Sequence, residues 1–84
     1  MSLQILYFAS LREAVGQSSE SLDLPEGLSS VGGLRRHLAE RGGHWAEAFG
    51  QGRLLASVNQ QMAEDDHPVA DGDEIAFFPP VTGG

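Results

Sequence analysis

Cysteine and lysine are absent from this 84-residue chain, and it has no long apolar run. Without cysteine there is no disulfide, no thiolate metal site and no cysteine nucleophile. Without lysine, no side-chain amine is available to form a Schiff base or accept an isopeptide bond. No segment approaches the roughly 20 apolar residues of a membrane span, and residues 1–9 lack the basic start of a signal peptide. These absences favour a cytoplasmic protein.

Negative charge predominates, because 12 Asp and Glu residues oppose 5 Arg residues and give a formal net charge of −7. Nucleic acids and anionic membranes bind basic surfaces, so we expect neither as a partner. The acidity suits either solubility alone or attraction to a basic partner surface. The length fits a single domain over residues 1–84 with a small core.

Hydrophobic periodicity predicts two strands, a helix and then further strands. In chain order these are strands over 3–9 and 21–24, a helix from Ser29 or Ser30 to 42–43, a short helical piece over 45–49, and strands over 53–58, 61–63 and 74–78. One main helix cannot cover both faces of a doubly wound sheet, which disfavours an α/β fold. The expected class is α+β, a roll with one main helix packed across one face of a mixed β-sheet.

Two local features modify these elements. Residues 10–13 have the spacing of a capping box, with Gly16 placed to end a short helix. Gly32 and Gly33 fall in the first turn of the main helix, and each weakens it by about 1 kcal/mol relative to alanine.

The sheet face opposite the helix is predicted to carry apolar side chains. Alternation along the strands places on it Gln4, Leu6, Phe8, Leu55, Ser57, Glu74, Ala76 and Phe78. A purely solvated face would not usually hold so many large apolar residues, so we predict a protein-docking surface. Its expected anchors are Phe8, Met62 and Phe78, with Leu55 weaker. The alternatives are a one-residue slip in a strand, or loops that cover the face.

Conventional catalytic motifs are missing from the sequence. His37, His44 and His67 are scattered without metal-ligand spacing, and the acidic residues between 65 and 74 do not fit a calcium-binding loop. We therefore expect no bound metal or cofactor, and no enzymatic activity of the chain on its own.

The carboxyl terminus is unusual, because no charged side chain occurs from Ile75 to Gly84. Pro79-Pro80 favours an extended, stiff exit from the last strand. Gly83-Gly84 removes every side chain beside the terminal carboxylate. Most chain ends are frayed, but frayed ends are usually polar. The pattern predicts that residues 79–84 form an extended tail that fits a narrow channel.

Three stretches resemble a known family: residues 6–13 (LYFASLRE), 54–60 (LLASVNQ) and 71–84 (DGDEIAFFPPVTGG). With the helix around 34–38 they span essentially the whole chain, and they resemble the sulfur-carrier subunits of molybdopterin synthase, ubiquitin-like proteins of β-grasp fold. The Phe-Phe-Pro-Pro lead-in is the most specific part, since a generic ubiquitin-like domain shares only the Gly-Gly. The chain departs from the family pattern at Gly32-Gly33 and in having no lysine.

The resemblance implies a chemistry for the tail. An adenylyltransferase related to ubiquitin-activating enzymes would use ATP to adenylate the carboxylate of Gly84, and a sulfur nucleophile would then leave a thiocarboxylate. Residues Pro80, Val81, Thr82 and Gly83 would position this group in the large synthase subunit, where it donates sulfur to a pyranopterin precursor. The family also implies an assembly of two small and two large subunits. The lack of cysteine agrees, because sulfur could then be carried only at the terminus.

Other functions fit the same residues. One is a sulfur carrier of thiamine thiazole synthesis, although such carriers are usually shorter and lack the FFPPVT run. Another is a protein modifier joined through Gly84 to a target lysine. A third is a non-covalent ubiquitin-like interaction module whose tail is never activated. Residues 71–84 favour molybdopterin synthesis.

Overall fold

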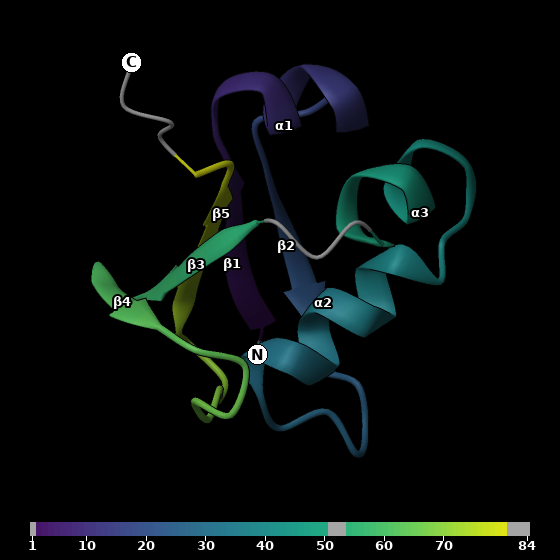
Figure 1. The fold of residues 1–84 in the computed structure, drawn as a ribbon. Coiled ribbons are helices and arrows are strands. Elements are labelled where there is room, and N and C mark those ends of the chain that lie inside the picture. The colour runs from purple at the N-terminus through teal and green to yellow at the C-terminus, as the bar shows by residue number, and fades with distance from the viewer. Residues whose placement is uncertain (1, 51–53, 81–84) are drawn as a thin grey trace.

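The computed structural model describes residues 2–50 and 54–80. Within these ranges it contains three helices and five strands (Figure 1). In chain order they are β1 (Ser2–Tyr7), α1 (Ala9–Val15), β2 (Ser19–Asp23), α2 (Val31–Ala39), α3 (Gly43–Gly50), β3 (Leu55–Val58), β4 (Gln61–Ala63) and β5 (Glu74–Phe78).

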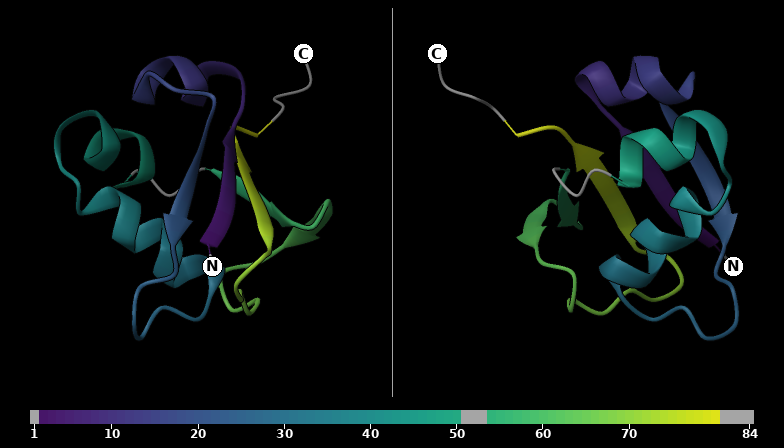
Figure 2. Two further views of the ribbon diagram at one scale, coloured as in Figure 1. Left: turned by 180° about the vertical axis from the view of Figure 1, so that it is seen from behind. Right: turned by 45° about the vertical axis from the view of Figure 1, so that its right-hand side comes forward.

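The five strands form one mixed sheet in the order β2-β1-β5-β3-β4. The neighbours β1 and β5 run parallel, with Ile5 opposite Ile75, while the other pairs are antiparallel. Helices α2 and α3 lie on one face of the sheet, and α1 lies beyond the end of β1 (Figure 2). The predicted α+β class is confirmed, and the short helices α1 and α3 accompany the main helix α2.

The core lies between the sheet and the helices on that face. Its largest fully buried side chains come from β1, α2 and β5: Leu3, Ile5, Tyr7, Val31, Leu34, Leu38, Ile75 and Phe77. Helix α3 closes one side of this core with aromatic rings. The centroid of the Phe49 ring lies 5.1 Å from that of Phe77, and the centroid of the Trp45 ring lies 5.4 Å from that of Tyr7. Edge-to-face pairs of this kind stabilise a core beyond the area they bury.

The start of α1 differs from the prediction. The helix begins at Ala9 after Phe8, which makes no side-chain capping bond, so Ser10 lies inside the helix and the predicted capping box is wrong. The physical reason is that the Phe8 N–H still donates to the Phe77 carbonyl oxygen of the sheet (3.2 Å). The chain then turns sharply at Ala9, whose φ is +55°. The helix does end at Gly16, as predicted, with a φ of +80°.

Other boundaries differ by a few residues. Strand β2 begins earlier than predicted, because its pairing with β1 extends to Ser19 opposite Leu6. Helix α2 ends at Ala39, ahead of the glycine pair 42–43, and the second glycine starts α3. Strand β3 begins at Leu55, and Arg53, its predicted first residue, lies outside the described residues.

The amino terminus of α2 is held by the loop that follows β4. The Ser30 Oγ accepts a hydrogen bond from the Gly33 N–H (3.1 Å), which confirms Ser30 as the N-cap. The N–H groups of the two residues between Ser30 and Gly33 donate to the loop: Val31 to the His67 carbonyl oxygen (3.0 Å) and Gly32 to the Asp65 carbonyl oxygen (2.8 Å). The loop therefore satisfies donors that a helix start leaves unpaired.

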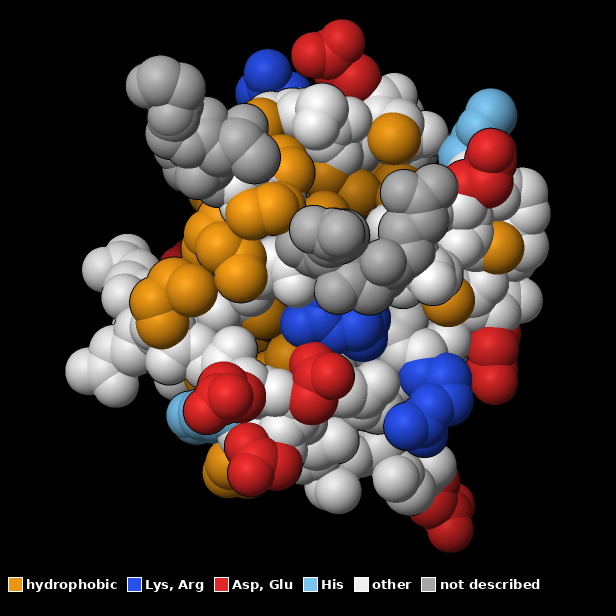
Figure 3. Space-filling view, viewed as in Figure 1, with side chains coloured by type: hydrophobic (Ala, Val, Ile, Leu, Met, Phe, Trp, Pro, Cys, Tyr) orange, Lys and Arg blue, Asp and Glu red, His pale blue; other side chains and the backbone are white. Residues whose placement is uncertain are grey.

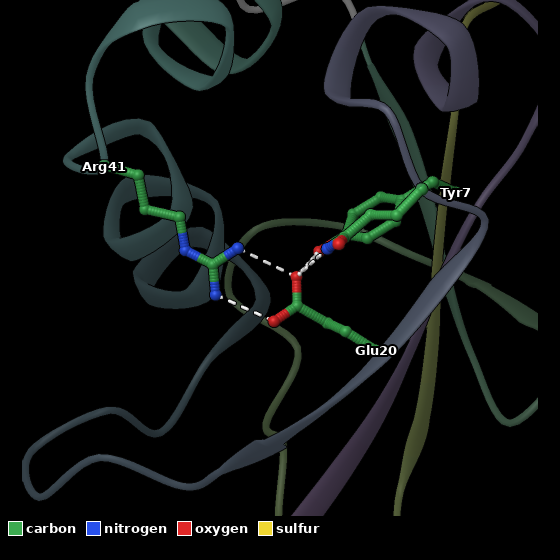
Figure 4. Close-up of polar contacts among 4 residues, drawn as sticks. Tyr7, Glu20 and Arg41 are labelled. Atoms are coloured by element: carbon green, nitrogen blue, oxygen red, sulfur yellow. Dashed lines mark hydrogen bonds and ion pairs between the residues drawn. The ribbon is translucent and has the colours of Figure 1, made fainter.

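A polar cluster joins β1, β2 and the segment between α2 and α3 (Figure 4). The Glu20 carboxylate accepts hydrogen bonds from the Tyr7 hydroxyl (2.8 Å), the Gln17 amide (2.7 Å) and, at both oxygens, the Arg41 guanidinium (2.8 Å each). The hydrogen-bonded guanidinium holds the pKa of Glu20 below its usual range. Burial, reinforced by the Glu20 carboxylate, raises the pKa of the Tyr7 hydroxyl.

Candidate docking surface and carboxyl-terminal segment

The open face of the sheet carries an apolar patch formed by Leu6, Phe8, Leu55, Met62, Ala76 and Phe78. The strand register brings these residues together from four parts of the chain. Leu55 lies opposite Phe78, in the row at the carboxyl-terminal end of β5. The next row runs from Leu6 to Ala76, Ser57 and Met62. The alternation predicted from the sequence is therefore confirmed, without a slip in any strand.

The patch is accessible in the described structure. Phe8 is 45% exposed, Leu55 38% and Met62 65%, and these are the exposed large hydrophobic residues of the described chain. Phe78, opposite Leu55, is partly buried. A band of hydrophobic side chains is visible on the left of the space-filling view (Figure 3). All four predicted anchors thus lie on one surface, and their role in docking stays a prediction.

The other end of the same face is polar. Gln4 lies opposite Glu74 on one side and Ser21 on the other. The Gln4 amide donates a hydrogen bond to the Ser21 hydroxyl (2.5 Å). Beyond β4 the patch is followed by exposed carboxylates at Glu64, Asp65 and Asp66. The apolar patch is therefore bordered by polar and acidic groups, as protein interfaces commonly are.

The carboxyl-terminal segment begins beside the patch. Pro79 and Pro80 directly follow Phe78, and Pro80 is exposed. The predicted tail residues Val81, Thr82, Gly83 and Gly84 lie outside the described residues. A partner that covers the patch would therefore sit next to the point from which the last four residues follow. This arrangement suits the delivery of a carboxylate into a partner's site.

Sequence reasoning missed one residue behind the patch. Arg35, next to the buried Leu34 of α2, has a side chain that is only 16% exposed and lies against the sheet. Its guanidinium donates to the Leu54 carbonyl oxygen (2.8 Å), pairs with Asp65 (3.0 Å) and lies 5.5 Å from the centre of the Phe77 ring. The available signal was its position between Leu34 and Leu38, on the edge of the buried stripe.

Within residues 2–50 and 54–80, no three His, Asp or Glu side chains are grouped so that they could hold a metal ion. In the same part of the chain, no helix is long and apolar enough to cross a membrane.

Comparison with known proteins gives consistent matches over the full length. The ThiS family matches residues 5–84. The molybdopterin synthase sulfur carrier subunit of Escherichia coli is 46% identical over 82 residues, which cover 98% of this chain and 99% of that protein.

Solved structures with the same fold include a putative molybdopterin converting factor, subunit 1, from Pyrococcus furiosus. It has a TM-score of 0.77 and 28% identity, covering 96% of this chain and 99% of that one. SAMP1 from Haloferax volcanii has a TM-score of 0.76 and 26% identity, with complete coverage of both chains.

Proposed function

The chain belongs to the ThiS family, and from this premise we propose that it is a sulfur carrier in molybdenum cofactor biosynthesis, loaded with sulfur at Gly84. Relatives named as molybdopterin synthase sulfur carrier subunits match nearly its whole length. The observation that carries the mechanism is the apolar patch beside Pro79 and Pro80, from which the tail continues. We propose that the carrier works in the cytoplasm as the sulfur-donor subunit of a synthase, without a cofactor of its own.

The loading chemistry follows from the weakness of a carboxylate as an electrophile. An activating adenylyltransferase would join the Gly84 carboxylate to the α-phosphate of ATP and release pyrophosphate. A sulfur nucleophile would then attack the carbonyl carbon of this mixed anhydride, and AMP would leave. Two glycines at the end let the reacting carbon approach a partner's backbone closely. The thiocarboxylate then passes its sulfur to a pyranopterin precursor and returns to a carboxylate for recharging.

The patch and tail act together in this proposal. Phe8, Leu55, Met62 and Phe78 would dock on the large synthase subunit and, in a separate complex, on the activating enzyme. Residues 79–84 would extend into the partner's channel and place the Gly84 carbonyl group at the reacting atoms. Supporting this assignment, Phe8, Leu55 and Met62 are exposed, Phe78 is partly buried opposite Leu55, and the tail follows directly after Phe78.

The first experiment tests loading at Gly84. The protein is incubated with the activating enzyme, ATP and a sulfur source, and its intact mass should rise by the difference between sulfur and oxygen. Oxidation of a methionine adds nearly the same mass, so the shift must be located by cleavage after Glu74, which releases residues 75–84 without methionine. A variant lacking Gly84 is the matched control and should neither gain the mass nor support synthase turnover. Turnover by that variant would contradict the mechanism.

Docking through the patch is tested separately. Phe78→Asp and Met62→Asp should each weaken binding to the large subunit by about 2 kcal/mol, because each places a charge in a desolvated apolar contact. Ser21→Asp is the matched control, since it adds the same charge at the polar end of the same face. Isothermal titration calorimetry measures the affinities, and circular dichroism checks the fold. Unchanged affinity for both patch variants would show that the partner binds elsewhere.

The alternatives differ in what happens at the tail. A non-covalent interaction module predicts no ATP-dependent mass change under any condition. A protein modifier, the function that the name of SAMP1 (small archaeal modifier protein 1) indicates, predicts an amide between Gly84 and a target lysine. A carrier for thiamine thiazole synthesis predicts the same thiocarboxylate but no sulfur transfer with the large synthase subunit. The mass experiment and the turnover assay separate these outcomes.

A further inference from the structure

Arg35 lies on the helix side of the sheet, behind the apolar patch. Its α-carbon belongs to α2, and its side chain, only 16% exposed, runs between this helix and the strands. A guanidinium in such a place loses much of its hydration, which costs free energy unless its donors are paired. The contacts that pair them are therefore informative.

The guanidinium contacts three segments, each of which carries one anchor of the patch. Its Nη1 donates to the Leu54 carbonyl oxygen (2.8 Å), one residue before the anchor Leu55. Its Nε and Nη2 lie 3.1 and 3.0 Å from Asp65 Oδ1, in the loop that follows the strand of Met62.

The third contact is with β5. The guanidinium carbon lies 5.5 Å from the centre of the Phe77 ring, within the range of a cation–π interaction. Phe77 faces the core, and the next residue, the anchor Phe78, faces the patch. One side chain on the buried side of the sheet thus touches the segments of Leu55, Met62 and Phe78.

We propose that Arg35 is a positioning residue for the docking surface: it fixes the relative places of β3, the end of β4 and β5, and so the spacing of their anchors. The inference rests on the proposed function, because it takes the patch to be the partner's contact surface. Arginine suits this role because its planar group offers five donors in a fixed arrangement. Asp65 is itself attached to α2, because its backbone carbonyl oxygen accepts a hydrogen bond from the Gly32 N–H (2.8 Å).

A second arginine provides a matched control. Arg41 forms a short ion pair with Glu20 (2.8 Å) and lies 4.4 Å from the centre of the Trp45 ring. Like Arg35, it combines an ion pair with a contact to an aromatic ring. Glu20 belongs to β2, however, which is at the opposite edge of the sheet from β4. Loss of Arg41 should lower stability without moving the anchors.

The experiment compares Arg35→Met and Arg41→Met with the wild type, all as full chains with an unmodified terminus. Calorimetry gives the Kd for the large synthase subunit, and amide hydrogen exchange reports the opening of the backbone at Leu55 and Ala63, whose N–H groups face the neighbouring strand. For Arg35→Met we expect a Kd about tenfold higher and faster exchange at both residues. For Arg41→Met we expect a Kd within about twofold, and any faster exchange at both residues should be matched at the buried residues of β1, because it follows only from lower global stability.

Arg35→Gln serves as the second variant should Arg35→Met fail to fold, and it should show the same direction with a smaller change. Glutamine is chosen over lysine because an amine would add an acylation site to a lysine-free chain. Unchanged Kd and exchange for the Arg35 variants, or an equal effect of Arg41→Met, would overturn the inference. Failure of the wild type to bind the large subunit would instead contradict the proposed function, and the exchange data would still decide whether Arg35 fixes these segments.

Discussion

Gly32 and Gly33 occupy the first turn of α2, yet their surroundings differ. A Cβ atom on Gly32 would lie 3.1 Å from the Asp65 Cβ and 3.2 Å from the Asp65 backbone oxygen. A Cβ atom on Gly33 would lie 3.4 Å from the Ser30 Oγ and 3.7 Å from the Leu28 Cγ, which is ordinary van der Waals contact. Only the first glycine is therefore required by its neighbours.

We expect opposite effects from alanine at these two residues. Gly33→Ala should raise the free energy of unfolding by about 0.5–1 kcal/mol, because alanine favours the helix. Gly32→Ala should lower it by about 1 kcal/mol, since the loop at Asp65 must shift and weaken its bond to the helix. Urea unfolding measures both variants, and each is the control for the other. An equal gain in both would show that the loop yields without cost.

Elements far apart in the chain are joined by the cluster of Tyr7, Glu20 and Arg41. Tyr7 comes from β1, Glu20 from β2 and Arg41 from the segment after α2. The Arg41 guanidinium also lies over the Trp45 ring of α3. The cluster thus attaches the sheet edge to the helical layer, and its strength depends on the charge of Glu20.

The pH dependence of stability should reveal this link. Arg41 lowers the pKa of Glu20 in the folded state, so its contribution is complete above the ordinary glutamate pKa and is lost as pH falls through the lowered value. Glu20→Gln should cost about 1–2 kcal/mol at pH 7, and the gap to the wild type should close below about pH 4. Unfolding in urea across pH 2–8 measures this.

The exposed residue Glu26, in the turn before α2, provides the control variant Glu26→Gln. A gap between wild type and Glu20→Gln that stays constant down to pH 2 would contradict the ionic role of Glu20.

Tyr7 gives the complementary test at high pH. Its pKa is raised, so its contribution is present below about pH 10 and declines as pH rises further. Tyr7→Phe should therefore change the alkaline limb, and it should change the acid limb less than Glu20→Gln does, because the Tyr7 hydroxyl is only one of the donors that lower the pKa of Glu20.

At the scale of the whole molecule, charge and apolar surface are arranged together. The formal net charge is −7, and exposed carboxylates at residues 64–66 lie just beyond β4. An acidic molecule with an apolar patch suits a partner whose pocket is apolar and bordered by basic groups. Long-range attraction would then bring the two proteins together before the patch is desolvated.

We therefore expect charge to affect mainly the association rate constant, and apolar contact to affect mainly the dissociation rate constant. Raising NaCl from about 0.05 to 0.5 M should lower the association rate constant with the large subunit by about tenfold or more, with little change in dissociation. Met62→Ala should instead raise the dissociation rate constant and leave the association rate constant nearly unchanged, because it removes apolar contact without changing charge. Stopped-flow measurements give both constants. Association that is independent of salt would show that the net charge has no part in recognition.

Much of this protein is determined by short-range sequence patterns. Alternation in 3–9, 53–58 and 74–78 predicted which side chains face the core, because neighbouring residues of a strand point to opposite faces whatever their partners. The uncharged segment from Ile75 to Gly84 indicated a tail with its own chemistry. The order of elements excluded a doubly wound fold.

Only the tertiary structure decided which distant residues meet. The pairing of Leu55 with Phe78, and of Ser57 with Met62, depends on register across β3, β4 and β5, which no local pattern specifies. The same holds on the buried side, where Arg35 reaches Leu54, Asp65 and Phe77. The start of α1 was likewise set by a bond to the sheet at Phe77. Spacing along the chain fixes the face of a side chain, whereas packing of the whole fold fixes its neighbours.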